Sequence, residues 1–360
     1  VIANPSLKWE TQISTDIALE FGLFDCLTGT IEYFKKDSKD LLFDVSQPAS
    51  VGVTSIIQNI GKVTNSGVEI ELDYNAFKNK DWSVSVGANA TFVKNKIKNL
   101  PATMKENGYI SGSKKWLEGK SIYEFWLRQW HGVDPQTGDG LYVADVSKYN
   151  QGNIGTGDGN ITQSQFDEYK KTVVTIDGKE LTNSYTYAKY DFSGSSIPDV
   201  FGGFNVRVSY KNFDLAAVFS YQLGGQVLDT NYATMMSMTE FGYAQSPDLL
   251  KAWKQAGDIT EVPRIDNSAA HTTNIGQSYS TRWLTSSDYL NLRSVTIGYQ
   301  FPKAWLSKVM LKSARLNLTA ENLFMLKARQ GLNPMANYSG VTYNEYMPSR
   351  NITLGLNVSF

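Results

Sequence analysis

The chain ends in Asn351-Ile352-Thr353-Leu354-Gly355-Leu356-Asn357-Val358-Ser359-Phe360, where polar and apolar residues alternate without a break. A strand with this period of two has one apolar face and one polar face. The apolar register runs to the final aromatic, whereas a strand in a soluble sandwich is usually followed by a turn or a polar tail. The pattern is typical of a strand that closes an outer-membrane barrel.

The same alternation recurs in other segments, so the prediction does not depend on one strand. Val206 and Phe219 lie on the apolar faces of two successive segments. The predicted polar faces carry five charged or amide side chains, namely Glu69, Glu71, Asp73, Asn205 and Arg207. Carboxylates are rarely buried without partners, so this face must meet water. We expect these side chains to face the lumen of an all-β, transmembrane antiparallel β-barrel.

The composition fits such a barrel and excludes a helical membrane protein. No run of 18 apolar residues occurs, and the mean hydropathy is −0.31, as expected when only alternate residues face lipid. Aromatic residues make up 12% of the chain, which suits interfacial girdles, although any β protein rich in aromatic strands would show the same value. A net charge of −1 without a basic run gives no support to a nucleic-acid partner. The single cysteine, Cys26, cannot form an internal disulfide.

The alternation predicts nine strands whose connections are short at one end and long at the other. They are Trp9–Phe21, Thr28–Asp40, Val63–Ala76, Trp82–Ile97, Phe201–Tyr210, Phe213–Leu223, Tyr289–Phe301, Ala314–Phe324 and Arg350–Phe360. In bacterial barrels the short turns are periplasmic and the long loops extracellular, so we expect Phe360 at the periplasmic rim. Ser121–Val133 also reads as a strand, and we expect it to pair within a long loop or to bring a second strand with it.

An odd count of nine or eleven strands cannot close a barrel, because bacterial single-chain barrels have even counts. The chain also begins without Met or a secretion signal, which such a barrel needs. We therefore expect residues 1–360 to be the C-terminal segment of a larger barrel protein.

Seven blocks of sequence, in order, and an opening signature carry a more specific resemblance. The opening signature is Asn4-Pro5-Ser6-Leu7-Lys8-Trp9-Glu10 with Tyr33-Phe34, and the seven blocks are Asn59–Glu69, Gly132–Gly138, Asp158–Thr162, Ile197–Gly203, Ser287–Arg293, Ala320–Phe324 and Gly355–Phe360. Together they resemble the SusC-like TonB-dependent transporters of Bacteroidota, and they span nearly the whole chain. The resemblance implies that this chain is the C-terminal part of a 22-stranded barrel. It also implies that the plug and the N-terminal strands of that barrel are absent from this chain.

The resemblance also implies a function and partners. It implies import of a nutrient ligand, an oligosaccharide or a peptide, across the outer membrane without bond chemistry and without a cofactor. The implied partners are a SusD-like surface lipoprotein, the TonB–ExbB–ExbD complex acting through the absent N-terminal part, outer-membrane lipid, and the barrel assembly machinery, for which Phe360 would be a signal. Two alternatives stay open: a surface receptor or adhesin barrel without active transport, and a soluble β-rich carbohydrate-binding protein.

Aromatic residues in the long loops are the candidates for contact with a ligand or a lid, since flat rings with polar edges stack on sugars and peptide side chains. These candidates are Trp116, Trp126, Trp130, Tyr142, Tyr279 and Trp283. Packing of the loops on each other, or an interfacial belt, would explain the same residues.

The sequence offers little for catalysis or metal binding. His131 and His271 are the only histidines, and we expect both in surface loops. Asp158 lies in a turn that resembles a calcium loop without its first and last carboxylates, so it is at most a weak metal candidate. Leu249–Gly257 reads as a short amphipathic helix that ends at a glycine, with Trp253 anchoring the loop core.

Overall fold

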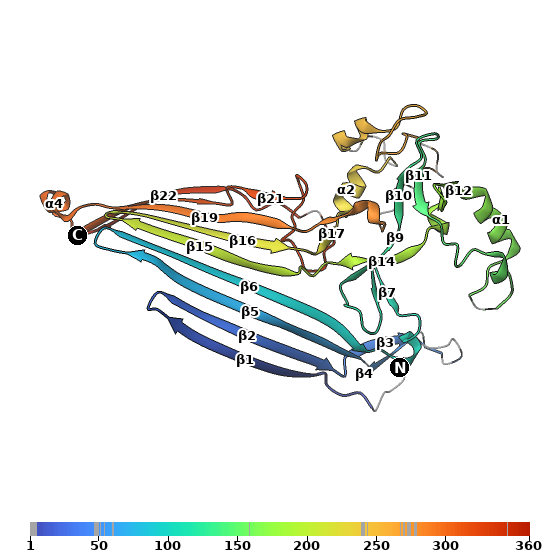
Figure 1. Ribbon diagram of the computed structural model, residues 1–360, viewed down its shortest axis with the longest axis horizontal. Helices are drawn as coiled ribbons and strands as arrows, with labels where there is room; N and C mark the ends of the chain where they lie inside the picture. The colour runs from blue at the N-terminus through green and yellow to red at the C-terminus, as the bar shows by residue number, and fades with distance from the viewer. Residues whose placement is uncertain are drawn as a thin grey trace.

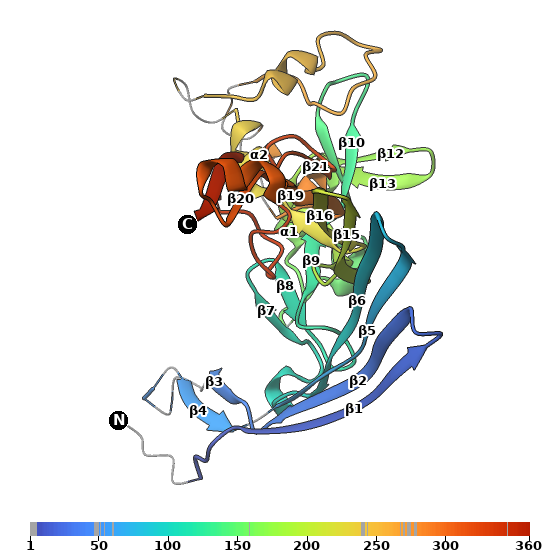
Figure 2. The same ribbon diagram turned by 90° about the vertical axis from the view of Figure 1, so that its left-hand side faces the viewer.

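The computed structural model describes residues 6–46, 50, 52–53, 55–59, 61–157, 159–238, 242, 244–266, 268, 271, 275–276, 279–343 and 345–360. Long antiparallel strands form a twisted sheet, and a mass of loops lies at one end of it (Figure 1). Seen from the opposite end, the sheet follows a curved path (Figure 2).

Nine strands follow one another in the main sheet, in the order β1-β2-β5-β6-β15-β16-β19-β20-β22. Their bounds are β1 Thr11–Leu23, β2 Leu27–Lys39, β5 Lys62–Lys78, β6 Trp82–Asn99, β15 Val200–Tyr210, β16 Phe213–Leu223, β19 Tyr289–Gln300, β20 Ser313–Glu321 and β22 Asn351–Ser359. All nine predicted strands are confirmed, with small shifts at their ends. The largest is in β20, which ends before Asn322 because that residue adopts a left-handed φ of 51°. A short strand, β21 (Met325–Lys327), follows and pairs with β19.

The strand register places apolar side chains opposite one another across seven strands. Each residue of the following row is the direct partner of the next: Phe77, Val84, Val208, Leu215, Ile297, Leu318 and Leu354. The adjacent row, on the other face, is Asn75, Ser85, Arg207, Ala216, Thr296, Thr319 and Thr353. The sheet therefore has one continuous apolar face and one largely polar face.

The apolar face has no covering layer among the residues that the structure describes. Leu354 is 69% exposed, and Ile297 is 48% exposed although it lies in a central strand. The three hydrophobic clusters lie instead mainly in the loops, around Phe125, around Tyr149 and around Leu100. A soluble sandwich would pack a second sheet on this face, so the arrangement fits a wall whose apolar side meets lipid.

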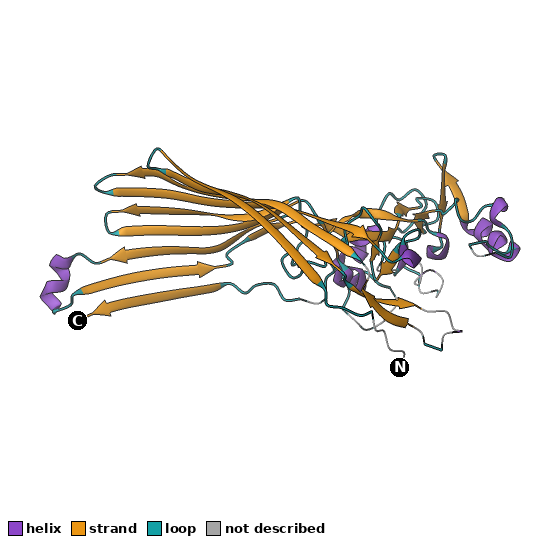
Figure 3. Cartoon of the chain, turned by 90° about the horizontal axis from the view of Figure 1, so that it is seen from below, coloured by secondary structure: helices purple, strands orange, loops and turns teal. Residues whose placement is uncertain are grey.

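The connections confirm the predicted asymmetry. Short turns join β1 to β2, β5 to β6 and β15 to β16, and the fourth link at this end carries α4 (Lys303–Leu306) and the 3-10 turn Ser307–Val309. The long connections lie at the opposite end, while Phe360 lies at the short-turn end, as expected (Figure 3).

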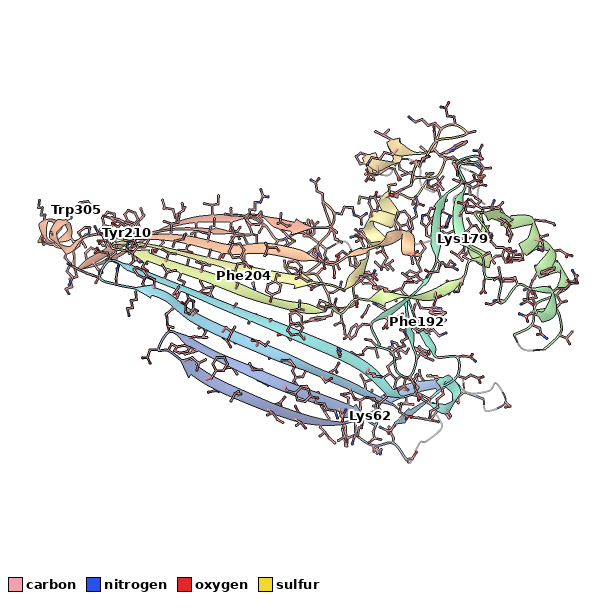
Figure 4. The ribbon with its side chains drawn as sticks, in the orientation of Figure 1. Lys62, Lys179, Phe192, Phe204, Tyr210 and Trp305 are labelled. Atoms are coloured by element: carbon pink, nitrogen blue, oxygen red, sulfur yellow. The ribbon has the colours of Figure 1, made fainter. Side chains whose placement is uncertain are left out.

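Aromatic residues form a row at the short-turn end. Trp82, Tyr210, Phe213 and Tyr299 are direct partners in four successive strands, and the rings of Trp82 and Tyr210 lie 4.3 Å apart. Figure 4 shows Tyr210 at this end, near Trp305 of α4. The row occupies the position of an interfacial girdle.

The long loops carry their own small sheets and helices. Their strands are β3 Leu42–Ser46, β4 Ser55–Asn59, β7 Tyr109–Ser111, β8 Lys114–Trp116, β9 Glu124–Arg128, β10 Trp130–Val133, β11 Gly140–Val143, β12 Val173–Ile176, β13 Lys179–Thr182, β14 Tyr190–Ser195, β17 Gln226–Leu228 and β18 Leu284–Ser286. The α-helices among them that the structure describes in full are α1 Gln163–Thr172 and α2 Thr230–Met235. The predicted strand Ser121–Val133 is split into β9 and β10, which pair with other loop strands as expected.

One loop prediction is wrong. Instead of an amphipathic helix over Leu249–Gly257, a 3-10 helix spans Pro247–Lys251 and ends at Ala252, which is extended. The tertiary contacts of Trp253 explain the early end, because its backbone N–H donates to the carbonyl of Val262 and its Nε1 donates to that of Pro135 at 3.0 Å. Within the described residues, no helix is long and apolar enough to cross a membrane.

Candidate functional site

The six loop aromatics are distributed among separate places in the loop mass. Trp116 packs edge-on against Phe43, with ring centroids 5.7 Å apart, and its Nε1 donates to the carbonyl of Ile122. Tyr279 is 39% exposed, and its carbonyl accepts a hydrogen bond from the N–H of Arg128. Trp116 therefore supports the loop base, and Tyr279 keeps exposed surface.

Trp126 lies on the outer side of a two-faced strand. In β9, Phe125 and Leu127 are fully buried, while Trp126 points the other way and meets Phe192 of β14 at 4.9 Å. The ammonium of Lys115 lies 4.0 Å from the centre of the Trp126 ring. Figure 4 shows Phe192 at this position in the loops. Aromatic and cationic groups thus form a partly exposed platform along β9 and β14.

Trp130, Tyr142 and Trp283 are brought together around Arg282, a residue that sequence reasoning missed. The guanidinium of Arg282 lies 4.7 Å from the ring centre of Trp130 and 4.3 Å from that of Trp283. Trp130 meets Tyr142 edge-on at 5.1 Å, and the backbone N–H of Trp130 donates to the hydroxyl of Thr281. We call these four residues the Arg282 cluster.

A cavity of about 340 Å³ opens beside this cluster. Trp130, Arg282 and Trp283 line it, together with residues of α2 and of the segment 260–262. Its lining includes Glu261, which is exposed, and His131. Polar and apolar groups therefore share the walls, as is usual for sites that orient a small ligand.

Burial affects the ionisation of two members of the cluster. It lowers the pKa of Arg282 to about 10, because the enclosed guanidinium has lost water around its charge. It also raises the pKa of Tyr142 to about 12. With a pKa of about 10, Arg282 stays protonated at neutral pH, so its side chain gives the cavity a positive charge.

Tyr142, which was predicted to contact a ligand, has no exposed surface, and its ring packs edge-on against that of Trp130. Contact of Tyr142 with a ligand stays a prediction. Trp283 is only 3% exposed but still lines the cavity.

A second arginine, Arg329, packs against Tyr232, a residue that lines the cavity. Arg329 forms an ion pair with the buried Asp229, and its guanidinium lies 3.6 Å from the ring centre of Tyr232. The hydroxyl of Tyr232 in turn donates to Asp248 at 2.8 Å. These contacts fix Tyr232, another lining residue of the cavity.

The predicted lumen-facing side chains occupy one face of the sheet. Asp73 and Asn205 approach each other over Gly87, where an added Cβ would lie 2.7 Å from the Asp73 carboxylate and 2.6 Å from the Asn205 amide. Arg207 belongs to the polar row, and Glu69 and Glu71 share the face of Asp73 by strand alternation. That this face lines a lumen stays a prediction.

The described residues offer no clustered ligands for a metal ion. Asp158 lies outside the described residues, and no group of three metal-ligating side chains occurs within them. His271 is buried and its Nε2 meets the carbonyl of Arg264, whereas His131 lines the cavity.

Known proteins resemble this chain over its whole length. It is 29% identical over 99% of its length to TonB-dependent receptor P3 of Formosa agariphila and 24% identical over 99% to TonB-dependent receptor SusC of Bacteroides thetaiotaomicron. Among solved structures, one of the RagAB peptide transporter matches with a TM-score of 0.77 and 24% identity, covering 100% of this chain and 36% of that one.

The chain spans about a third of the curated relatives it matches, with 35% of receptor P3 and 32% of SusC covered. The family described as TonB dependent receptor-like, beta-barrel matches residues 1–323. Proteins of this family are outer-membrane proteins, so the soluble carbohydrate-binding alternative is excluded. The chain therefore belongs to the TonB dependent receptor-like β-barrel family.

Proposed function

We propose that this chain forms the C-terminal wall and extracellular loops of a TonB-dependent importer that takes up an oligosaccharide or a peptide. The observation that carries the proposal is the combination of a one-layer wall, apolar on one face, with loops that hold partly exposed aromatic groups at one end. A plug and the segment that contacts TonB would belong to the remaining length of the protein.

A SusD-like surface lipoprotein is the proposed lid, and TonB–ExbB–ExbD the proposed source of energy. Relatives support this pairing, since one is SusC and another is part of the RagAB transporter. Because a lid must contact the loops, the platform on β9 and β14 and the cavity of the Arg282 cluster are the surfaces we assign to ligand and lid. No bond is made or broken in this scheme.

Uptake in cells tests the proposal. Bacteria that express the full-length protein with its lipoprotein would receive fluorescent peptide and maltooligosaccharide mixtures, and cargo protected from an external quencher would be measured. We expect protected cargo in wild-type cells and none after deletion of TonB. A receptor or adhesin without transport would bind cargo at the surface equally with and without TonB, which would contradict import. Mass spectrometry of recovered cargo should show it chemically unchanged.

A further inference from the structure

The charged guanidinium of Arg282 has few hydrogen-bond acceptors and no paired carboxylate among the described residues. Of the five N–H donors of an arginine, one has a partner among the described residues, since Nη1 donates to the carbonyl of Ile275 at 3.2 Å. No carboxylate lies within ion-pair distance of it in that same part of the chain. By contrast, Arg264 and Arg329 each hold an aspartate.

The groups packed against the Arg282 guanidinium are uncharged aromatic rings. The guanidinium packs against the rings of Trp130 and Trp283, which do not neutralise its charge, and among the described residues only Nη1 has an acceptor. A partly desolvated cation gains most from an anion that can accept two parallel hydrogen bonds. A planar carboxylate meets this requirement, whereas a neutral hydroxyl does not.

The other charge in the cavity is placed differently. Glu261 lines the same cavity but is exposed to water and lies beyond ion-pair distance of Arg282. The cavity is therefore positive beside the two tryptophans and negative at its exposed side. A ligand that carries a carboxylate next to a flat apolar group would match both the charge and the rings.

We propose that the cavity of the Arg282 cluster binds a carboxylate of the imported ligand, with Arg282 as its receptor group. The inference rests on the proposed import function and narrows the ligand to one with an accessible carboxylate. The free C-terminus of a peptide and a uronic acid of an oligosaccharide both present this group, and binding measurements separate the two sources.

Two matched pairs of probes test the inference by calorimetry on the full-length protein in detergent. One pair is the tripeptide Ala-Ala-Phe with a free C-terminus and the same tripeptide as its amide. The other is a methyl cellobioside and its counterpart with a terminal glucuronate. We expect the acid of one pair to bind at least tenfold more tightly than its neutral partner, and that pair identifies the source.

Substitutions then locate the effect. Arg282→Gln should remove the preference within the pair, and Arg282→Lys should keep part of it, because a lysine retains the charge but not the two-pronged geometry. Lys254→Gln removes a positive charge from the same loop outside the cavity lining and should leave the preference intact.

Modification of the wild-type protein avoids any doubt about folding of the variants. Phenylglyoxal should modify Arg282, and mass spectrometry should show that the acid probe protects it while the neutral probe does not. Equal binding within both pairs, or equal modification with either probe, would overturn the inference. If the acid probe binds selectively but uptake does not depend on TonB, the import proposal fails and the carboxylate site stands. If uptake depends on TonB but Arg282→Gln keeps the preference for the acid probe, the carboxylate site fails and the import proposal stands.

Discussion

Arg315 of β20 and Asp214 of β16 form an ion pair of 2.6 Å across an intervening strand. The pair passes over Gly298 of β19, where an added Cβ would lie 2.2 Å from the guanidinium and 2.7 Å from the carboxylate. Glycine is thus needed here for close approach and not for an unusual φ. The pair ties three neighbouring strands together on the polar face of the sheet.

Gly298→Val should break this ion pair, because the valine side chain would occupy the space between the guanidinium and the carboxylate. Both partners are about a third exposed, so the loss should be about 1 kcal/mol or less, in the range of partly solvated pairs. In a double-mutant cycle measured by urea unfolding of the full-length protein, Gly298→Val should cost less once Arg315→Gln is present. Additive effects would mean that the glycine serves another purpose.

Lys114 in β8 should make stability depend on pH. Its side chain is 9% exposed, and burial lowers its pKa from 10.5 to about 7, although Nζ donates to the carbonyl of Tyr123. Between about pH 7 and 10.5 the unfolded chain binds this proton and the folded chain does not, so stability should rise with pH across this window.

The matched variant for this test is Lys114→Met. Thermal unfolding at pH 6, 8 and 10 should show the wild type gaining stability relative to the variant as the pH rises. The full burial penalty of the charged lysine applies below about pH 7. Parallel pH profiles of the two proteins would mean that Lys114 keeps its ordinary pKa.

Removal of Phe360 should impair assembly more than its contacts suggest. The ring is 80% exposed just after β22, so its deletion removes little packing. If the assembly machinery reads this terminal strand, labelling of an extracellular loop in whole cells should fall sharply. Phe24→Asp, which changes another exposed aromatic at the same end, is the control and should insert normally. Wild-type labelling of the Phe360 deletion would make the residue an ordinary girdle aromatic.

The strands of the wall could be predicted from sequence because their signal is local. A period of two needs only a few neighbouring residues, and Leu354 and Thr353 already show it. The alternation of short and long connections could be predicted as well, because it depends only on the spacing of the strands along the chain. The exact end of β20 was missed, because it depends on the left-handed conformation of Asn322.

The site was predicted only in part, because contacts far apart in sequence build it. Trp130 and Thr281 are 151 residues apart and yet share a hydrogen bond, and this brings Arg282 to Trp130. No local sequence pattern predicts the contact between Arg282 and Trp130. An arginine beside a tryptophan in a long loop was the available signal, but the burial of Tyr142 could not be read from its residue type.

The central claim is that the apolar face of the sheet meets lipid, and spin labelling of the full-length protein in liposomes tests it most directly. With Cys26 replaced by Ser, single cysteines at Val206, Arg207 and Val208 would carry nitroxides, and their collisions with oxygen, which concentrates in lipid, would be measured. The account predicts high oxygen access at Val206 and Val208 and low access at Arg207 between them. Equal access at all three positions, or the reverse order, would contradict it.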